Sequence, residues 1–208
     1  MKGHYIPITM RKAGAEGFLL FKYLKMNMKH IVCLCCVITV VLMSATAHPD
    51  SAELEVVDSV DLSRYLGKWY EIASYPAWLQ RGRTASTAEY AMLTDGKIRI
   101  INRCHKGRTD GPLKESVGKA EVSDDQTNTK LKVWFFWPFK GNYWIIDLDD
   151  DYRWAVVGEP KRKYLWILSR TPTMNQTLYQ NILSRLPSKG YDPSKLNPTL
   201  QKTTSGID

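Results

Sequence analysis

The feature that most constrains the fold of this chain is a series of eight short runs that alternate apolar and polar residues, each ended by residues typical of turns. The runs are residues 68–75, 85–93, 97–104, 114–122, 130–136, 143–147, 152–157 and 164–170. Because brief connections join antiparallel neighbours, the pattern predicts an all-β, eight-stranded up-and-down antiparallel meander. Closure into a barrel would remove the exposed edges and leave an interior large enough for a small ligand. A sandwich filled by its own side chains is also compatible with this periodicity.

The C-terminal part follows a helical period instead. Apolar residues between 174 and 186 recur at helical spacing, and Thr173 with Gln176 three residues later is typical of a capping box. We therefore expect one amphipathic helix, ended by Pro187, that packs on the barrel. The polar tail after Leu200 is expected to fray.

Residues 1–47 are predicted to be an N-terminal extension with a secretory signal peptide. Ile31–Met43 is an uncharged apolar stretch of 13 residues, preceded by basic residues and followed by Ala45-Thr46-Ala47. A membrane-spanning helix needs about 20 apolar residues, so this stretch is too short to be a retained anchor. Cleavage after Ala47 would leave one domain at residues 48–208, and the true start codon is left open between the first methionine and Met26 or Met28.

The charge and cysteine content expected after cleavage argue against a nucleic-acid-binding protein, a lipid-modified protein and a disulfide-bonded domain. The formal net charge is +8, but removal of residues 1–47 leaves 23 basic against 20 acidic residues, so nucleic-acid binding is not expected. Three of the four cysteines lie in the N-terminal apolar stretch, and none stands near the expected cut. We therefore expect neither a lipid-modified cysteine nor an internal disulfide, because Cys104 is the only remaining thiol.

The period of two assigns side chains to the two faces of each strand. The inward faces predicted in this way carry Trp69, Glu71, Ala73 and Tyr75 in the first strand, Ile98, Ile100, Asn102 and Cys104 in the third, Leu131, Val133 and Phe135 in the fifth, and Tyr164, Trp166, Leu168 and Arg170 in the last. Trp137 joins the inward set if the alternation continues to Pro138. A buried carboxylate is costly, so Glu71 should be paired, protonated or in contact with a wet cavity, unless it is solvated at a strand end. Trp134 and Phe136 are left outside, where they either form a partner or membrane contact or are singly exposed aromatics.

Three segments together resemble the signature regions of the lipocalin family. They are Gly67-Lys68-Trp69-Tyr70 at the start, the acidic turn Asp149-Asp150-Asp151-Tyr152, and Arg170 at the end of the last strand. The stretches LGKWYEIA, LKVWFFWPF and YLWILSRTP are most similar to the bacterial Blc-type and apolipoprotein D-like branches of that family. The likeness extends from about residue 61 to residue 196.

The resemblance implies a barrel with one closed and one open end. Gly67, Trp69 and Arg170 would form the structural floor, with the guanidinium of Arg170 over the indole ring of Trp69. The open end would admit a fatty acid, a lysophospholipid or another small lipid. The ligand-binding candidates are Glu71, Ala73, Tyr90, Asn102, Phe135, Trp137, Tyr143 and Trp166.

The function expected from these features is carriage or storage of a hydrophobic lipid, without catalytic residues, cofactor or metal. Two alternatives remain: a lipid isomerase or synthase that uses Cys104 as nucleophile, and a homodimeric interaction protein. Peripheral membrane contact is compatible with carriage. A bacterial source would place the protein in the periplasm or at the outer membrane, and a eukaryotic source would imply secretion.

Overall fold

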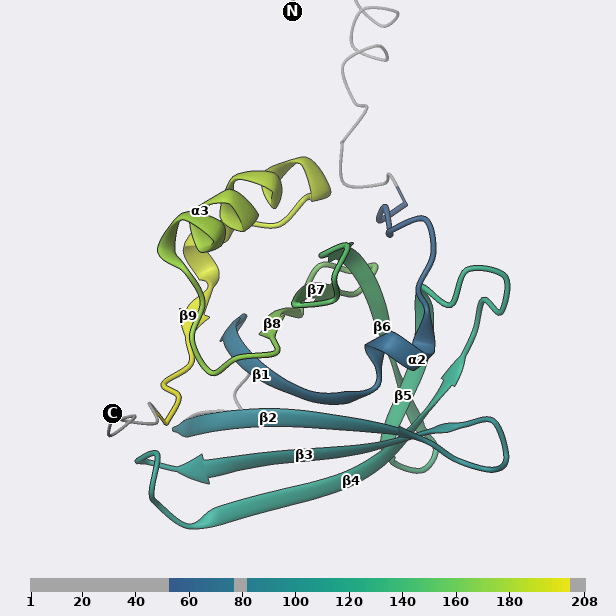
Figure 1. Ribbon diagram of the computed structural model, residues 1–208, viewed down its shortest axis with the longest axis horizontal. Helices are drawn as coiled ribbons and strands as arrows, with labels where there is room; N and C mark the ends of the chain where they lie inside the picture. The colour runs from purple at the N-terminus through teal and green to yellow at the C-terminus, as the bar shows by residue number, and fades with distance from the viewer. Residues whose placement is uncertain (1–52, 77–81, 203–208) are drawn as a thin grey trace, which may run out of the picture. The chain divides into compact units, whose positions relative to one another are not determined.

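The computed structural model describes residues 53–76 and 82–202 (Figure 1). The predicted signal peptide and the domain boundary at residue 47 lie outside these residues. The elements, in chain order, are α2 (Leu62–Tyr65), β1 (Gly67–Ser74), β2 (Arg83–Met92), β3 (Ile98–Lys106), β4 (Leu113–Val122), β5 (Lys130–Phe136), β6 (Phe139–Leu148), β7 (Trp154–Gly158), β8 (Leu165–Ser169), α3 (Gln176–Arg185), the 3₁₀ turns η3 (Pro187–Lys189) and η4 (Pro193–Lys195), and β9 (Asn197–Pro198).

The strands form a closed antiparallel barrel, so the sandwich alternative is wrong. Each of β2 to β8 pairs with its neighbours in the chain, and β1 pairs with both β8 and β2. The barrel closes where Trp69 of β1 lies opposite Ala88 of β2. Closure gives each strand from β1 to β8 a partner on both sides over at least part of its length, which reduces the exposed edges as expected of a meander of this length.

Buried side chains form two clusters on opposite faces of this sheet. One lies inside the barrel and contains Trp69, Tyr90, Ile100, Tyr143 and Ile145. The other lies between the outer face of the barrel and α3, which packs across the sheet (Figure 1). The predicted helix on the barrel is therefore confirmed. None of the helices within the described residues has the length and apolar character needed to cross a membrane.

The N-terminus of α3 differs from the predicted capping box. Asn175, not Thr173, is the N-cap residue, and its side-chain oxygen accepts hydrogen bonds from the backbone N–H groups of Thr177 and Leu178. The carbonyl oxygen of Thr173 instead accepts a hydrogen bond from the hydroxyl of Thr171 in the preceding turn. Asparagine is as good a cap as threonine, so the tertiary course of the turn decides between them.

The C-terminal segment fills the seam where β1 and β2 diverge. β9 pairs with Ala73 and Ser74 of β1, and the backbone N–H of Ala85 in β2 donates to the carbonyl oxygen of Leu200 at 2.6 Å. The side-chain amide of Gln201 donates to a carbonyl oxygen on each strand, at 2.7 and 2.9 Å. We expected the tail to fray directly after Leu200, but these hydrogen bonds hold Gln201 in place, so the expectation is wrong for that residue.

Candidate functional site

One end of the barrel is sealed by a tryptophan and an arginine. Trp69 is 0% exposed, and its indole N–H donates to the carbonyl oxygen of Tyr65 at 2.8 Å. The guanidinium carbon of Arg170 lies 3.7 Å from the centre of the Trp69 ring. Gly67 begins β1 with a φ of +90°, a conformation that favours glycine, and a Cβ there would lie 3.6 Å from the Arg170 side chain.

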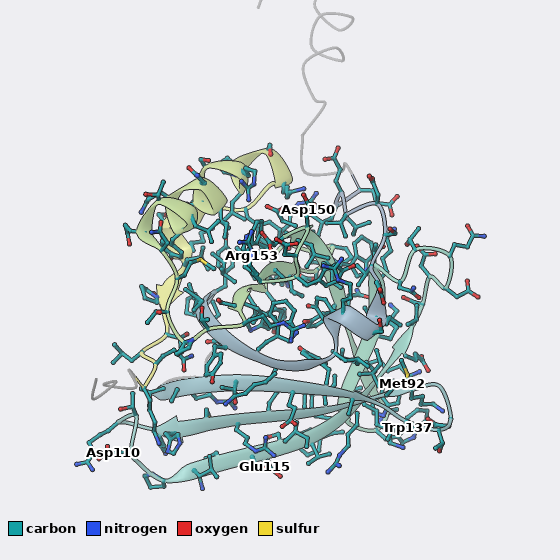
Figure 2. All side chains as sticks on the ribbon, in the orientation of Figure 1. Met92, Asp110, Glu115, Trp137, Asp150 and Arg153 are labelled. Carbon is teal, nitrogen blue, oxygen red and sulfur yellow. The ribbon has the colours of Figure 1, made fainter. Side chains whose placement is uncertain are left out.

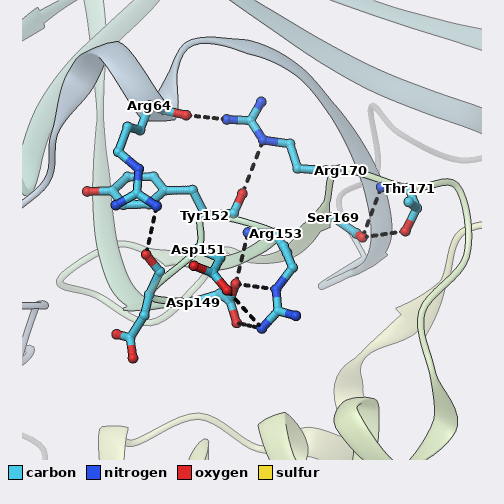
Figure 3. Close-up of polar contacts among 9 residues, drawn as sticks. Arg64, Asp149, Asp151, Tyr152, Arg153, Ser169, Arg170 and Thr171 are labelled. Atoms are coloured by element: carbon cyan, nitrogen blue, oxygen red, sulfur yellow. Dashed lines mark hydrogen bonds and ion pairs between the residues drawn. The ribbon is translucent and has the colours of Figure 1, made fainter.

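Backbone carbonyl groups from three segments hold Arg170 in place. Its guanidinium donates to the carbonyl oxygens of Lys68 at 2.9 Å, Arg64 at 2.6 Å and Tyr152 at 3.2 Å. Figure 3 shows the contacts with Arg64 and Tyr152. The arginine therefore ties α2, the start of β1 and the β6–β7 turn to a single side chain.

The acidic turn supports this floor from below. Asp149 accepts hydrogen bonds from the Arg153 side chain at 2.8 and 3.0 Å, and this hydrogen bonding lowers the pKa of the Asp149 carboxyl group (Figure 3). The ring of Tyr152 stacks under the guanidinium of Arg64, 4.2 Å away. The turn thus uses its charges to hold its own shape and to present the Tyr152 carbonyl oxygen to Arg170.

Three tyrosine hydroxyl groups meet just above the floor. The hydroxyl of Tyr143 lies 2.7 Å from that of Tyr65 and 3.0 Å from that of Tyr90. Burial raises the pKa of Tyr90 to about 12 and holds the pKa of Tyr65 and of Tyr143 well above the ordinary value. All three are therefore protonated at neutral pH. Tyr90 and Tyr143 were predicted candidates, whereas Tyr65 was missed because it lies on the four-residue α2, which carries no periodic signal.

The interior farther from the floor carries a polar side chain, Asn102. Asn102 lies opposite Ala88 and shares a face of β3 with the buried Ile100, so its side chain points inward. Its amide makes no hydrogen bond among the described residues. In the described part of the chain, every fully buried side-chain nitrogen or oxygen has a hydrogen-bond partner. The Asn102 amide has none and the residue is only half-buried, so its amide atoms are in contact with solvent. Solvent therefore enters the barrel at least to this level.

The carboxylate of Glu71 accepts hydrogen bonds from hydroxyl groups in this part of the interior, away from the floor. One of its oxygens accepts hydrogen bonds from Ser74 at 3.0 Å and from Thr199 of the C-terminal segment at 2.6 Å. Trp166 lies opposite Ser74, packs against the interior cluster, and stacks on Tyr164 with a ring separation of 5.9 Å. Phe135 also packs against the interior cluster, and its ring covers Gly118.

Two of the predicted wall residues do not face the interior. A β-bulge between Glu71 and Ala73 shifts the register of β1, so Ala73 and Tyr75 point outward into the cluster under α3. Trp137 follows a register shift between Val133 and Phe136 and is 78% exposed at the tip of the β5–β6 hairpin (Figure 2). The inward assignment is therefore corrected for Ala73 and Trp137, and also for Tyr75, because alternation holds only up to an irregularity in the strand.

At the end of the barrel opposite the Trp69 floor, basic side chains on the inner face of the strands lack carboxylate partners among the described residues. Lys114 lies directly opposite the inward-facing Cys104, and Arg83 lies opposite Lys106 at the same end of the sheet. By contrast, Arg103 on the outer face forms ion pairs with Glu89 at 2.7 Å and Glu115 at 2.8 Å. The outer charge is thus compensated, while the inner rim keeps a net positive charge.

The environment of Cys104 does not favour a nucleophilic thiolate. Burial raises the pKa of its thiol. The neighbouring His105 points to the other face, where its Nδ1 lies 2.6 Å from the carbonyl oxygen of Gly111. Within the described residues, no histidine is therefore placed to accept the proton of the thiol.

Comparison with known proteins is consistent with this architecture. The chain is 44% identical over 140 residues to the outer membrane lipoprotein Blc of Escherichia coli K12, covering 67% of this chain and 78% of that protein. It is 37% identical over 161 residues to temperature-induced lipocalin-1 of Arabidopsis thaliana, covering 74% and 87%, and 30% identical over 155 residues to apolipoprotein D of Mus musculus, covering 70% and 79%.

Among solved structures, insecticyanin from the tobacco hornworm Manduca sexta superposes with a TM-score of 0.58 at 20% identity, covering 76% of this chain and 88% of that one. This likeness concerns the fold alone. The family model described as a lipocalin-like domain matches residues 60–201. With the closed barrel, the single packed helix and the tryptophan–arginine floor, these matches establish that the chain belongs to the lipocalin family.

Proposed function

We propose that this protein reversibly binds a fatty acid or a lysophospholipid inside the barrel and carries or stores it, without catalysing a reaction. The observation that carries this proposal is the contrast between the two ends of the interior. Trp69 and Arg170 seal one end, whereas the solvent-reached Asn102 and the half-buried Phe135 and Trp166 line the other. An apolar chain that covers such aromatic surface gains roughly 25 cal/mol per Å² of area removed from water.

The charges at the mouth favour a ligand whose head group stays there. Arg83, Lys106 and Lys114 supply uncompensated positive charge near the inward-facing Cys104. Glu71 supplies a carboxylate, and hydroxyl groups occupy only one of its two oxygens. A fatty acid carboxylate or a lysophospholipid phosphate would find its counter-charge here, while its chain extends toward the floor.

Export and membrane contact complete the proposed role. The N-terminal pattern and the relationship to an outer membrane lipoprotein and to apolipoprotein D support an exported carrier that maintains envelope or membrane lipids, or a secreted one in a eukaryote. The hairpin between β5 and β6 exposes Phe136, Trp137 and Phe139. We propose that this hairpin touches the membrane interface, where aromatic side chains are favoured. If Trp137→Ser binds lipid vesicles as well as the wild type does, that contact is refuted. If Trp137→Ser changes only self-association, the exposed aromatic residues instead form a homodimer contact.

Native mass spectrometry and fluorescence together test carriage. Protein purified after incubation with lipid extract should retain one lipid, and added lysophospholipid should quench tryptophan emission saturably. Trp166→Phe should remove much of the quenching, whereas Trp144→Phe, on the outer face of the barrel between Lys130 and the cluster under α3, should not. Absence of both a retained lipid and saturable quenching would refute the proposal.

The cysteine enzyme is tested separately. Cys104→Ser should leave lipid binding intact, and thiol modification of the wild type should be slow because the thiol is buried with a raised pKa. Rapid modification that abolishes turnover of a lipid substrate would instead establish the enzyme.

A further inference from the structure

The three buried tyrosines above the floor hold more hydrogen-bond donors than they use. Tyr65 comes from α2, Tyr90 from β2 and Tyr143 from β6, so segments distant in sequence converge on one point. Their hydroxyl groups form a chain with Tyr143 in the middle, at 2.7 Å from Tyr65 and 3.0 Å from Tyr90. We call these residues the tyrosine triad.

A count of protons shows that one donor is left over. Each phenol hydroxyl carries one hydrogen, so the triad has three hydrogens but only two internal hydrogen bonds. Whichever way the two bonds are oriented, one O–H group has no acceptor within the triad. No other group of the described residues accepts it, because the triad hydroxyls have no further hydrogen bonds there. An O–H donor left without an acceptor in an apolar interior is costly, so this position favours an oxygen supplied from outside the protein.

The triad adjoins the part of the interior that solvent reaches. Tyr90 lies opposite Ile100, and the next inward pair along the same two strands is Ala88 with Asn102. That step is about 7 Å along a strand. Tyr90 and Tyr143 also keep 7% and 9% of their surface exposed, whereas Trp69 beneath them keeps 0%. A chain that passes Asn102 therefore arrives at the triad before it meets the floor.

We propose that the tyrosine triad is a subsite for an uncharged oxygen acceptor, such as a keto or hydroxyl group, carried on the inserted part of the lipid. This inference rests on the proposed lipid carriage and adds a chemical preference at the deep end of the interior. A carboxylate is disfavoured there because the triad is neutral. The nearest cation, Arg170, is committed to backbone carbonyl oxygens and to the Trp69 ring.

The test moves one oxygen along an otherwise constant chain. Dissociation constants are measured for octadecanoic acid and for octadecanoic acids with a single keto group at successive carbons. The wild type should show a minimum at one or two adjacent positions, where the keto acid binds about two- to tenfold more tightly than keto acids substituted elsewhere. A variant with Tyr65→Phe, Tyr90→Phe and Tyr143→Phe should lose the minimum, so that its dissociation constants for the keto acids no longer depend on the position of the keto group. Tyr70→Phe, on the outer face under Lys68, is the matched control and should keep it.

A second measurement on the unaltered protein covers the case in which the triple variant does not fold. Buried tyrosine hydroxyl protons exchange slowly, so proton NMR should resolve the triad and show one resonance that shifts when the favoured keto acid binds but not when octadecanoic acid binds. Octadecanoic acid binding with a flat keto profile and unchanged hydroxyl resonances would overturn the inference while leaving carriage intact. Failure of every acid to bind would refute carriage itself, and the inference with it.

Discussion

Replacement of Arg170 by alanine is expected to destabilise the barrel by about 3 kcal/mol. The cation–π contact with Trp69, at 3.7 Å from the ring centre, accounts for about 1–2 kcal/mol of this value. Charge-assisted hydrogen bonds contribute about 1.5–3 kcal/mol each when they are buried. The Arg170 hydrogen bonds to Lys68 and Arg64 are exposed, and the hydrogen bond to Tyr152 is partly buried. In the variant, water can therefore hydrogen-bond to most of the carbonyl groups that Arg170 contacts, which reduces the free energy lost.

Urea unfolding followed by tryptophan fluorescence measures this loss. The midpoint should fall at an unchanged slope, because the unfolded surface is the same in the variant. Arg170→Lys should recover only a minor part, since a lysine ammonium cannot present the planar fork that reaches several carbonyl groups at once. Arg153→Ala is the matched control, because that side chain is exposed and pairs mainly with Asp149 in the same turn.

A loss below about 1 kcal/mol for Arg170→Ala would refute the view that this arginine locks the floor. Equal losses in Arg170→Ala and Arg153→Ala would refute it as well, because they would mean that the β6–β7 turn alone carries the stability.

Further predictions concern the glycine, the tail, alkaline pH and the thiol. Gly67→Ala should cost about 1–2 kcal/mol and alter near-ultraviolet circular dichroism around Trp69, because a side chain is forced into a φ of +90°; an unchanged midpoint would contradict this. Truncation after Leu196 should lower Tm by roughly 2–4 °C for each kcal/mol of stability lost and speed hydrogen exchange at the Ala85 amide, which donates to the tail; unchanged exchange would show that the tail does not hold the seam. Stability should fall as the pH rises above 10 and through about 12, the raised pKa of Tyr90, because the unfolded state releases the phenol proton first; the triple phenylalanine variant should fall less steeply. Non-reducing electrophoresis should show a monomer, because Cys104 is buried, and a covalent dimer would contradict that burial.

Much of the barrel follows from alternation and turn chemistry. All eight predicted runs correspond to strands, since each is short and bounded by turn residues. The inward set of β3 also holds, because β3 pairs with β4 without a register shift from Ile98 to His105. A regular strand lets one correctly assigned residue fix the direction of all the others.

The errors lie where the ladder is interrupted. Ala73 and Trp137 were assigned to the interior by counting through a bulge and through a hairpin end, respectively. The bulge in β1 has no marker in the local sequence, because neither glycine nor proline stands there, whereas Pro138 directly follows Trp137 and marks the end of the hairpin strand. Tyr65 and Thr199 escaped notice for a different reason: each reaches the site from a segment outside the eight runs, through contacts that close only in the folded barrel.

The bulge in β1 explains how one strand serves two cores. Before the bulge, Trp69 and Glu71 point into the barrel, and after it Ala73 and Tyr75 point toward α3. Without the extra residue, Tyr75 would enter the upper interior, and the hydroxyl that now contacts the backbone of Asp192 would lose its partner. The ring of Tyr75 is therefore kept out of the barrel interior because the strand changes face before it. The same change aims Ser74 back at Glu71, so the register shift that keeps Tyr75 out of the interior also places a hydroxyl group that donates to the Glu71 carboxylate.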